Sequence, residues 1–168
     1  DLGKYQGQIE DLELVDFKSR QHKSDAFLAV NPMGKLPALV HRGVAITESA
    51  AICTYLADAF PAAHLAPAWS DPVRGTYLRW MFFTATCVEY ATLDRMLGRP
   101  PVERVTAIGY GTYEDTLATV EKAIGQGTWL CGDQFTAADV FLGALLGYCI
   151  MTKSVDPSAT SHAASVSA

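Results

Sequence analysis

The sequence lacks the features that mark several large classes of proteins. Its 13 lysines and arginines are outnumbered by 18 aspartates and glutamates, and no basic stripe occurs, which argues against a nucleic-acid partner. No apolar run reaches the roughly 20 residues that span a membrane, and none resembles a signal peptide, so we expect no membrane association. The 168 residues, 49% of them apolar, are instead enough for one good core or two small ones.

Cysteine is also sparse, and its spacing excludes the usual cysteine-based sites. The four cysteines are Cys53, Cys87, Cys131 and Cys149. They form no CxxC pair, and the four histidines are too scattered to indicate a metal site. We therefore expect free thiols, no disulfide and no metal. Free thiols are typical of a reducing compartment, which favours a cytoplasmic location.

The most informative stretch is 31–49, where a turn leads into a short apolar strand that contains Pro37. Proline donates no hydrogen bond, so within a sheet it belongs at an edge, a strand start or a bulge. A cis Leu36–Pro37 bond would turn the Leu36 backbone outward, whereas an ordinary trans edge proline is the alternative.

A hairpin and a helix start follow this strand. Arg42-Gly43 predicts a tight turn between 39–41 and 44–46, because glycine supplies the positive φ that such turns need. Glu48-Ser49 then opens a helix that Pro61 ends. An exposed strand edge, a carboxylate and a helix N-terminus would surround one small space, which suits an extended, peptide-like anion. The alternative is that the serine is only a helix cap.

The remaining sequence predicts one more strand and four more helices. The strand is at 13–17, and the helices are at 24–30, from Asp71-Pro72 to about 97, at 102–124, and from 137 to about 151. The last helix follows Thr136, which forms a capping box with Asp139.

Two motifs in this order resemble the glutathione transferase superfamily. The motif NPMGKLPAL at 31–39, followed by TES at 47–49, is similar to the thioredoxin-like N-terminal half of that family. The segment 21–27 resembles theta-like and related bacterial members, and the resemblance extends from about Leu12 to about Ile150. It implies an α/β thioredoxin-like domain followed by an all-α helical bundle.

The resemblance also implies a set of site residues. Pro37 would be the cis-proline of the family, and the glutathione-binding residues would be His22, Lys35, Leu36, Glu48 and Ser49. The Leu36 backbone would pair with the cysteinyl part of glutathione, Glu48-Ser49 would hold the γ-glutamyl end, and His22 with Lys35 would lie near the glycyl carboxylate. As structural alternatives, the histidine is a solvated loop residue, the lysine protects a strand edge, and the glutamate favours the helix dipole.

By the same resemblance, the domain order is a thioredoxin-like domain at 1–62, a linker at 63–70, an all-helical domain at 71–151 and a Ser/Ala-rich, poorly ordered tail at 152–168. We expect the first strand of the family, with its thiol-activating Ser, Tyr or Cys, to precede Asp1, which leaves the first domain incomplete. The catalytic residue is therefore unknown, and Asp1–Gly7 is interpreted as the end of the first helix.

The resemblance implies an enzyme that conjugates the thiolate of glutathione, its co-substrate, to a hydrophobic electrophile, with detoxification as the role and a homodimer as the assembly. Four aromatic residues either line the electrophile site or belong to the core: Trp80, Phe82, Phe83 and Tyr90. The alternatives are a glutathione-dependent thiol reductase or dehalogenase on the same fold, or a non-catalytic interaction module.

Overall fold

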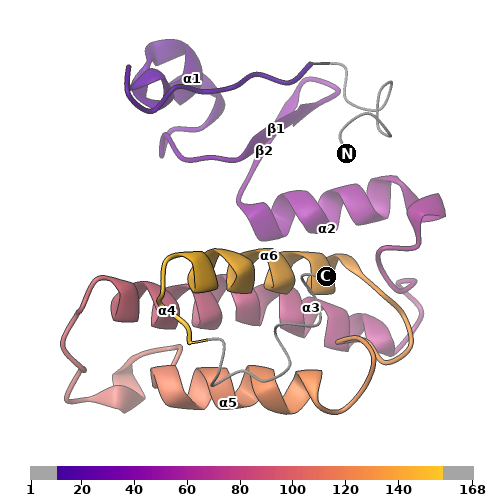
Figure 1. Cartoon of the computed structure of the whole chain (residues 1–168). Coiled ribbons are helices and arrows are strands. Elements are labelled where there is room, and N and C mark those ends of the chain that lie inside the picture. The colour runs from indigo at the N-terminus through magenta and orange to yellow at the C-terminus, as the bar shows by residue number, and fades with distance from the viewer. Residues whose placement is uncertain (1–10, 157–168) are drawn as a thin grey trace. The chain divides into compact units, whose positions relative to one another are not determined.

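The computed structural model describes residues 11–156, which form two compact units that divide between Glu48 and Ser49 (Figure 1). Each unit is described by itself. The predicted helix end at Asp1–Gly7 and the tail from Pro157 onward lie outside the described residues.

The first unit is built around a β-hairpin. The strands β1 (Ala38–His41) and β2 (Val44–Thr47) pair antiparallel, with Ala38 opposite Thr47. Arg42 and Gly43 between them have φ angles of 53° and 77°. Positive φ at both central residues is the geometry of a type I′ turn, whose twist matches that of the strands. The predicted hairpin is therefore confirmed.

Two short helices precede the hairpin. They are the 3₁₀ helix η2 (Gln21–Lys23) and the helix α1 (Asp25–Val30). Ser24 caps α1, since its hydroxyl accepts a hydrogen bond of 3.3 Å from the Phe27 N–H. This confirms the helix predicted at 24–30 and satisfies one of the N–H groups left free at a helix start.

The strand predicted at 13–17 is wrong. Residues 11–16 have no regular structure, and Leu14 is 84% exposed. A strand needs a neighbour, and within residues 11–156 the only sheet consists of β1 and β2. Asp16 instead closes a turn, because its carboxylate accepts a hydrogen bond of 2.8 Å from the Lys18 N–H.

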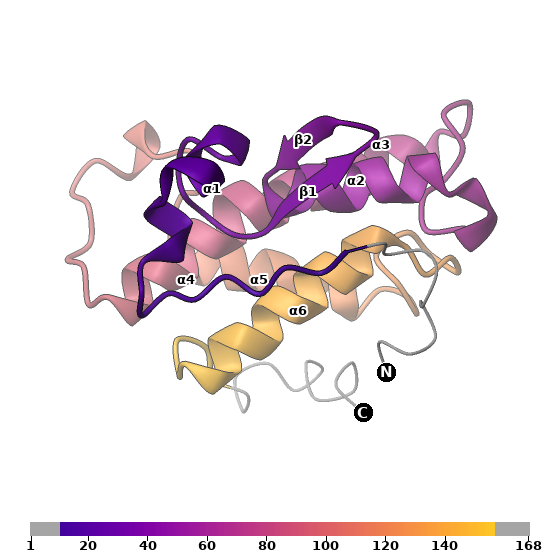
Figure 2. The ribbon, with the colours of Figure 1, turned by 90° about the horizontal axis from the view of Figure 1, so that it is seen from above.

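The second unit is helical. It contains α2 (Ser49–Ala59), η3 (Pro61–Ala63), α3 (Val73–Phe83), η4 (Thr84–Val88), α4 (Glu89–Met96), η5 (Val105–Ala107), α5 (Tyr113–Ile124) and α6 (Ala137–Met151). Within this unit α6 packs along α3 and also contacts α2, while α5 packs against α4 and η4 (Figure 2). None of the helices in residues 11–156 has the length and apolar composition needed to cross a bilayer.

The predicted helix from Asp71-Pro72 to about residue 97 is present with one irregularity. The Asp71 carboxylate accepts a hydrogen bond of 2.9 Å from the Val73 N–H, as a capping residue does. Between α3 and α4 the segment η4 is a π-helical turn, and α4 ends before Gly98, whose φ is 62°.

The helix predicted at 102–124 is wrong in its first half, since α5 begins only at Tyr113. Gly111 has a φ of 74°, which a right-handed helix does not allow. Thr112 then acts as the N-cap and accepts a hydrogen bond of 3.0 Å from the Asp115 N–H. Apolar residues before Gly111 do recur at helical spacing, but the positive φ of Gly111 and the N-cap at Thr112 delay the start of the helix to Tyr113.

A buried ion pair joins α2 to α3. The Arg74 guanidinium donates two hydrogen bonds to the Asp58 carboxylate, of 2.8 and 2.7 Å, and a third of 3.0 Å to the Pro67 carbonyl. The bonds to Asp58 raise the pKa of Arg74 above its ordinary value. Trp69 covers the same guanidinium, with its ring centre 4.1 Å away. These contacts fix α2 to the helical core.

The core of this unit is formed mainly by α3 and α6, and it includes Trp80, Met81 and Ala138. Trp80 is only 3% exposed, so it is a core residue and does not line a surface site. Beyond α6, Val155 is buried against Leu117 and Cys149, so the first residues of the predicted tail are packed.

The start of α6 is held by the predicted capping box. The Asp139 carboxylate accepts hydrogen bonds of 2.8 Å from the Thr136 N–H and of 2.8 Å from the Leu130 N–H. The Thr136 hydroxyl accepts one of 3.3 Å from the Ala138 N–H. Asp139 thus satisfies two backbone donors, one of them outside the helix.

We predict that Asp139→Ala destabilises the protein more than Thr136→Ala. The first change leaves a buried and a half-buried N–H group without an acceptor, so we expect a loss of about 3 kcal/mol in the free energy of unfolding. The second removes one cap and should cost about 0.5–2 kcal/mol. Urea denaturation followed by circular dichroism measures both, with the exposed Asp133→Ala as control. Equal losses for Asp139→Ala and the control would contradict this account.

Candidate functional site

The loop between α1 and β1 is closed by a single side chain. The Asn31 amide donates a hydrogen bond of 2.8 Å to the Lys35 carbonyl, and its Oδ1 accepts one of 3.1 Å from the Met33 N–H. The Asn31 carbonyl accepts a further bond of 2.8 Å from the Gly34 N–H. Asn31 is only 3% exposed, whereas Lys35 and Leu36 point to solvent. The buried asparagine therefore shapes a loop that presents the next two residues outward.

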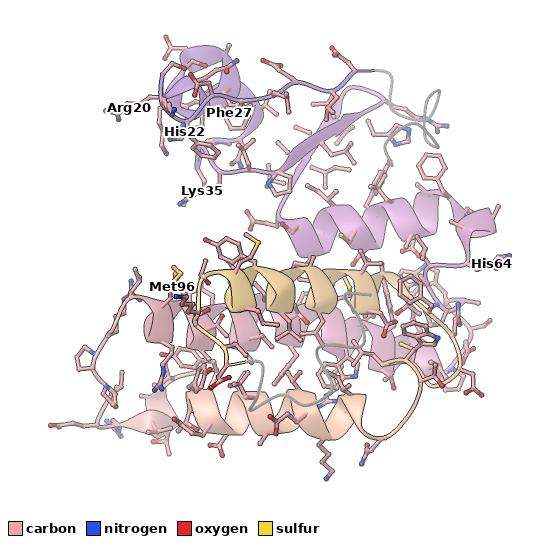
Figure 3. All side chains as sticks on the ribbon, in the orientation of Figure 1. Arg20, His22, Phe27, Lys35, His64 and Met96 are labelled. Carbon is pink, nitrogen blue, oxygen red and sulfur yellow. The ribbon has the colours of Figure 1, made fainter. Side chains whose placement is uncertain are left out.

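This loop packs tightly against η2. Gly34 has a φ of 60°, and a Cβ at this position would lie 2.6 Å from the His22 carbonyl oxygen. The Lys23 ammonium donates a hydrogen bond of 2.8 Å to the Met33 carbonyl. Because Lys35 directly follows Gly34, the structure brings His22 and Lys35 together on one side of the unit (Figure 3).

The residues that lead into β1 are exposed. The Leu36–Pro37 peptide bond is cis, as the resemblance implies, and the Leu36 side chain is 39% exposed. In the part of the chain that the structure describes, β1 has β2 as its only strand neighbour. Leu36 is exposed and lies two residues before β1, so its backbone groups suit an extended peptide that binds by strand addition.

The hairpin register brings the residues before β1 and the residues after β2 to the same end of the hairpin. Ala38 lies opposite Thr47, so Pro37 and Glu48 are the next residues at the same end of the hairpin. Glu48 is exposed and has a φ of 69°, which turns the chain out of β2. Ser49 follows through one peptide bond and is the first residue of α2. Glu48 thus lies at the same end of the hairpin as the Leu36–Pro37 segment, and Ser49 follows it in the chain.

The charges at the two ends of this arrangement differ in sign. Lys35 is an exposed cation, and the neighbouring His22 has a buried Nδ1 without a hydrogen-bond partner. The His22 ring contacts that of Phe17, with a centroid separation of 4.8 Å. At the other end of the hairpin segment, Glu48 is an exposed carboxylate, and Ser49 follows it in the chain as the first residue of α2. The first unit thus carries exposed groups of opposite charge, Lys35 and Glu48, which suit the oppositely charged groups of a ligand.

The four thiols of the second unit are free in the structure. Burial raises the pKa of Cys53 and Cys131, which reduces their thiolate content at neutral pH. Cys87 is half-buried, and its sulfur lies 3.7 Å from the Thr86 hydroxyl. Among residues 11–156 no group of three His, Cys, Asp or Glu residues is placed to hold a metal ion.

The residues that build the loop, Asn31, Gly34 and Lys23, are not identified by the sequence pattern. The available signal was an asparagine before a proline, three residues ahead of a glycine, which is typical of a turn. Nothing in the spacing indicates that the asparagine is buried.

Comparison with known families agrees with this geometry. Residues 10–58 match the family "Glutathione S-transferase, N-terminal domain", and residues 67–157 match "Glutathione S-transferase, C-terminal domain". The chain belongs to the glutathione S-transferase family. This membership indicates a transferase enzyme and confirms the predicted fold class, a thioredoxin-like N-terminal domain followed by a helical one.

Individual glutathione S-transferases and related proteins show the same similarity. Glutathione S-transferase GstA of Escherichia coli O157:H7 is 31% identical over 81% of this chain and 68% of its own length. Maleylacetoacetate isomerase of Pseudomonas aeruginosa is 33% identical over 73% of this chain and 60% of its own length. A sphingomonad glutathione S-transferase complexed with glutathione has 29% identity and a TM-score of 0.70, over 90% of this chain and 76% of that one. The chain thus spans 60–68% of these two curated relatives.

We predict that Gly34→Ala destabilises the first unit more than Gly43→Ala. Both glycines have positive φ, so either alanine is strained by about 1–2 kcal/mol. Only the Cβ at position 34 meets backbone, while the space around Gly43 is open. Hydrogen exchange of the amides at 21–35 measures the difference. Equal protection in the two variants would contradict the packing of this loop on η2.

We predict that iodoacetamide modifies native Cys87 at least about tenfold faster than Cys131, because the Cys131 thiol is 8% exposed and burial raises its pKa. Peptide mass spectrometry at successive times gives both rates, and the urea-unfolded protein serves as control, in which the rates should converge. Equal rates in the native protein would show that Cys131 is accessible.

Proposed function

We propose that the protein is a glutathione transferase, which conjugates the thiolate of glutathione to hydrophobic, electrophilic small molecules. The observation that supports this proposal is the hairpin register, by which the exposed Leu36–Pro37 segment and Glu48 lie at the same end of the hairpin. A tripeptide with charged ends and two amides matches the donors and acceptors available there. The solved glutathione complex of a relative with the same fold supports the choice of ligand.

Each part of glutathione has a partner of suitable chemistry. Lys35 and His22 receive the glycyl carboxylate, and the Leu36 backbone pairs with the cysteinyl amides as an added strand. Glu48 binds the ammonium, while Ser49 and the first N–H groups of α2 bind the γ-glutamyl carboxylate. Charge-assisted hydrogen bonds contribute about 1.5–3 kcal/mol each, which together offsets the cost of association.

Conjugation further requires a thiolate. A thiol with a pKa of about 8.5 is only a few per cent ionised at pH 7, and lowering its pKa by about two units needs roughly 2.7 kcal/mol of differential stabilisation. The residues assigned here bind and orient the peptide, and none of them is proposed as the group that stabilises the thiolate.

A different glutathione-dependent reaction at the same site is the second candidate. The similarity to an enzyme named maleylacetoacetate isomerase favours it, because one fold can host several reactions. Product analysis separates the two candidates: conjugation consumes glutathione, whereas isomerisation leaves its concentration unchanged.

The assembly, location, role and domain division that we propose rest on the same assignment. We propose a homodimer in the cytoplasm with a role in detoxification, and a division of the chain into a glutathione-binding domain at 1–62, a linker at 63–70 and a helical domain at 71–151. Sedimentation equilibrium tests the dimer, and limited proteolysis tests the linker.

We predict that Glu48→Ala weakens glutathione binding by about 10- to 150-fold, since it removes a charge-assisted hydrogen bond. Ser49→Ala removes a single hydroxyl and should weaken binding by up to about tenfold. Isothermal titration of the whole chain measures both, with the exposed Glu121→Ala of α5 as a charge-matched control. Unchanged affinity in Glu48→Ala, or no binding by the unmodified protein, would refute the proposed site.

A further inference from the structure

We infer that Asn31 is a positioning residue, which orients the Leu36 N–H so that the edge before β1 can pair with the cysteinyl part of glutathione. This inference rests on the proposed function, because it assigns the residue that prepares the backbone of the same site. Asn31 itself is buried and makes no contact with the ligand in this scheme.

The argument starts from the geometry of one peptide unit. The Asn31 Nδ2 donates to the Lys35 carbonyl at 2.8 Å. That carbonyl and the Leu36 N–H belong to the same peptide unit, which is planar and trans, so the two groups point in opposite directions. Holding the carbonyl toward Asn31 therefore holds the N–H on the opposite side, away from the asparagine.

The asparagine is itself fixed at three other points. Its Oδ1 accepts from the Met33 N–H at 3.1 Å, its carbonyl accepts from the Gly34 N–H at 2.8 Å, and its own N–H donates to the Phe27 carbonyl of α1 at 2.9 Å. The side chain uses a donor and an acceptor at once, which an amide supplies and a carboxylate does not. The Lys35–Leu36 peptide unit is thus anchored to the end of α1.

The orientation of this unit matters because the next residue is proline. Pro37 has no N–H, so Leu36 is the last residue before β1 that can donate to a docking peptide. An antiparallel partner exchanges both the N–H and the carbonyl of one residue, and loss of the donor removes half of that pair. Asn31 therefore controls recognition of the peptide backbone, whereas Lys35 and Glu48 recognise the charged ends.

The test is a glutathione titration of ¹⁵N-labelled protein, in which the Leu36 amide resonance is followed together with the buried Leu142 amide as reference. Asn31→Leu keeps the volume and neutrality of the side chain but removes both hydrogen bonds. Ser24→Ala is the matched control, because it removes the cap of α1 and leaves the Lys35–Leu36 unit untouched.

We expect the Leu36 resonance to move on binding in the unmodified protein, and the affinity to fall about tenfold in Asn31→Leu but less than twofold in Ser24→Ala. Affinity within twofold of the unmodified protein in Asn31→Leu overturns the inference and leaves the proposed function intact. A Leu36 amide that stays as still as Leu142 at saturation also overturns it, even if Asn31→Leu fails to fold. No binding by the unmodified protein refutes the proposed function, and the inference with it.

Discussion

The pairing of two four-residue strands is the constraint on which the candidate site depends. Because Ala38 lies opposite Thr47, the residues before β1 and after β2 are forced to the same end of the hairpin. A shift of one residue in this register would turn every side chain of the strand to the other face and separate the Leu36 backbone from Glu48. The type I′ turn at Arg42-Gly43 fixes the register, so a turn at one end of the hairpin determines which residues of the candidate site meet at the other.

Two different kinds of support hold the residues of the site. Leu36 and Lys35 depend on hydrogen bonds within a loop, where the buried amide of Asn31 replaces regular backbone pairing. Ser49 is supported by the helical core instead, because α2 buries Ile52 and Ala57 and is tied to α3 through Asp58 and Arg74. The Lys35–Leu36 peptide unit, which is proposed to pair with a peptide backbone, is thus held by a hydrogen bond. The charged side chains of Lys35 and Glu48 remain exposed to solvent.

Local signals were sufficient to predict much of this structure. The hairpin turn, the Ser24 cap and the Thr136–Asp139 capping box were correct because each depends on residues within a few positions of one another. The strand at 13–17 failed because a strand depends on a partner that its own sequence does not specify. The long helix predicted from residue 102 is wrong because Gly111, with its positive φ, and the N-cap Thr112 interrupt the apolar spacing.

The sequence indicates residues for the candidate site, but not how the loop that carries Lys35 and Leu36 is built. The motif indicated His22, Lys35, Leu36, Glu48 and Ser49 through a family resemblance, and the cis bond at Pro37 agrees with it. The burial of Asn31 and the contact of Gly34 with the His22 carbonyl arise from packing between segments about ten residues apart. Periodicity carries no information about such contacts, so only the three-dimensional structure identifies them.

A crystal structure of the protein with glutathione bound tests the central claim most directly. The account predicts that the cysteinyl residue pairs antiparallel with Leu36, and that the γ-glutamyl group reaches Glu48 and the first turn of α2. Glutathione bound away from the Leu36–Pro37 edge, or a Glu48–Ser49 turn that faces away from that edge, would contradict it.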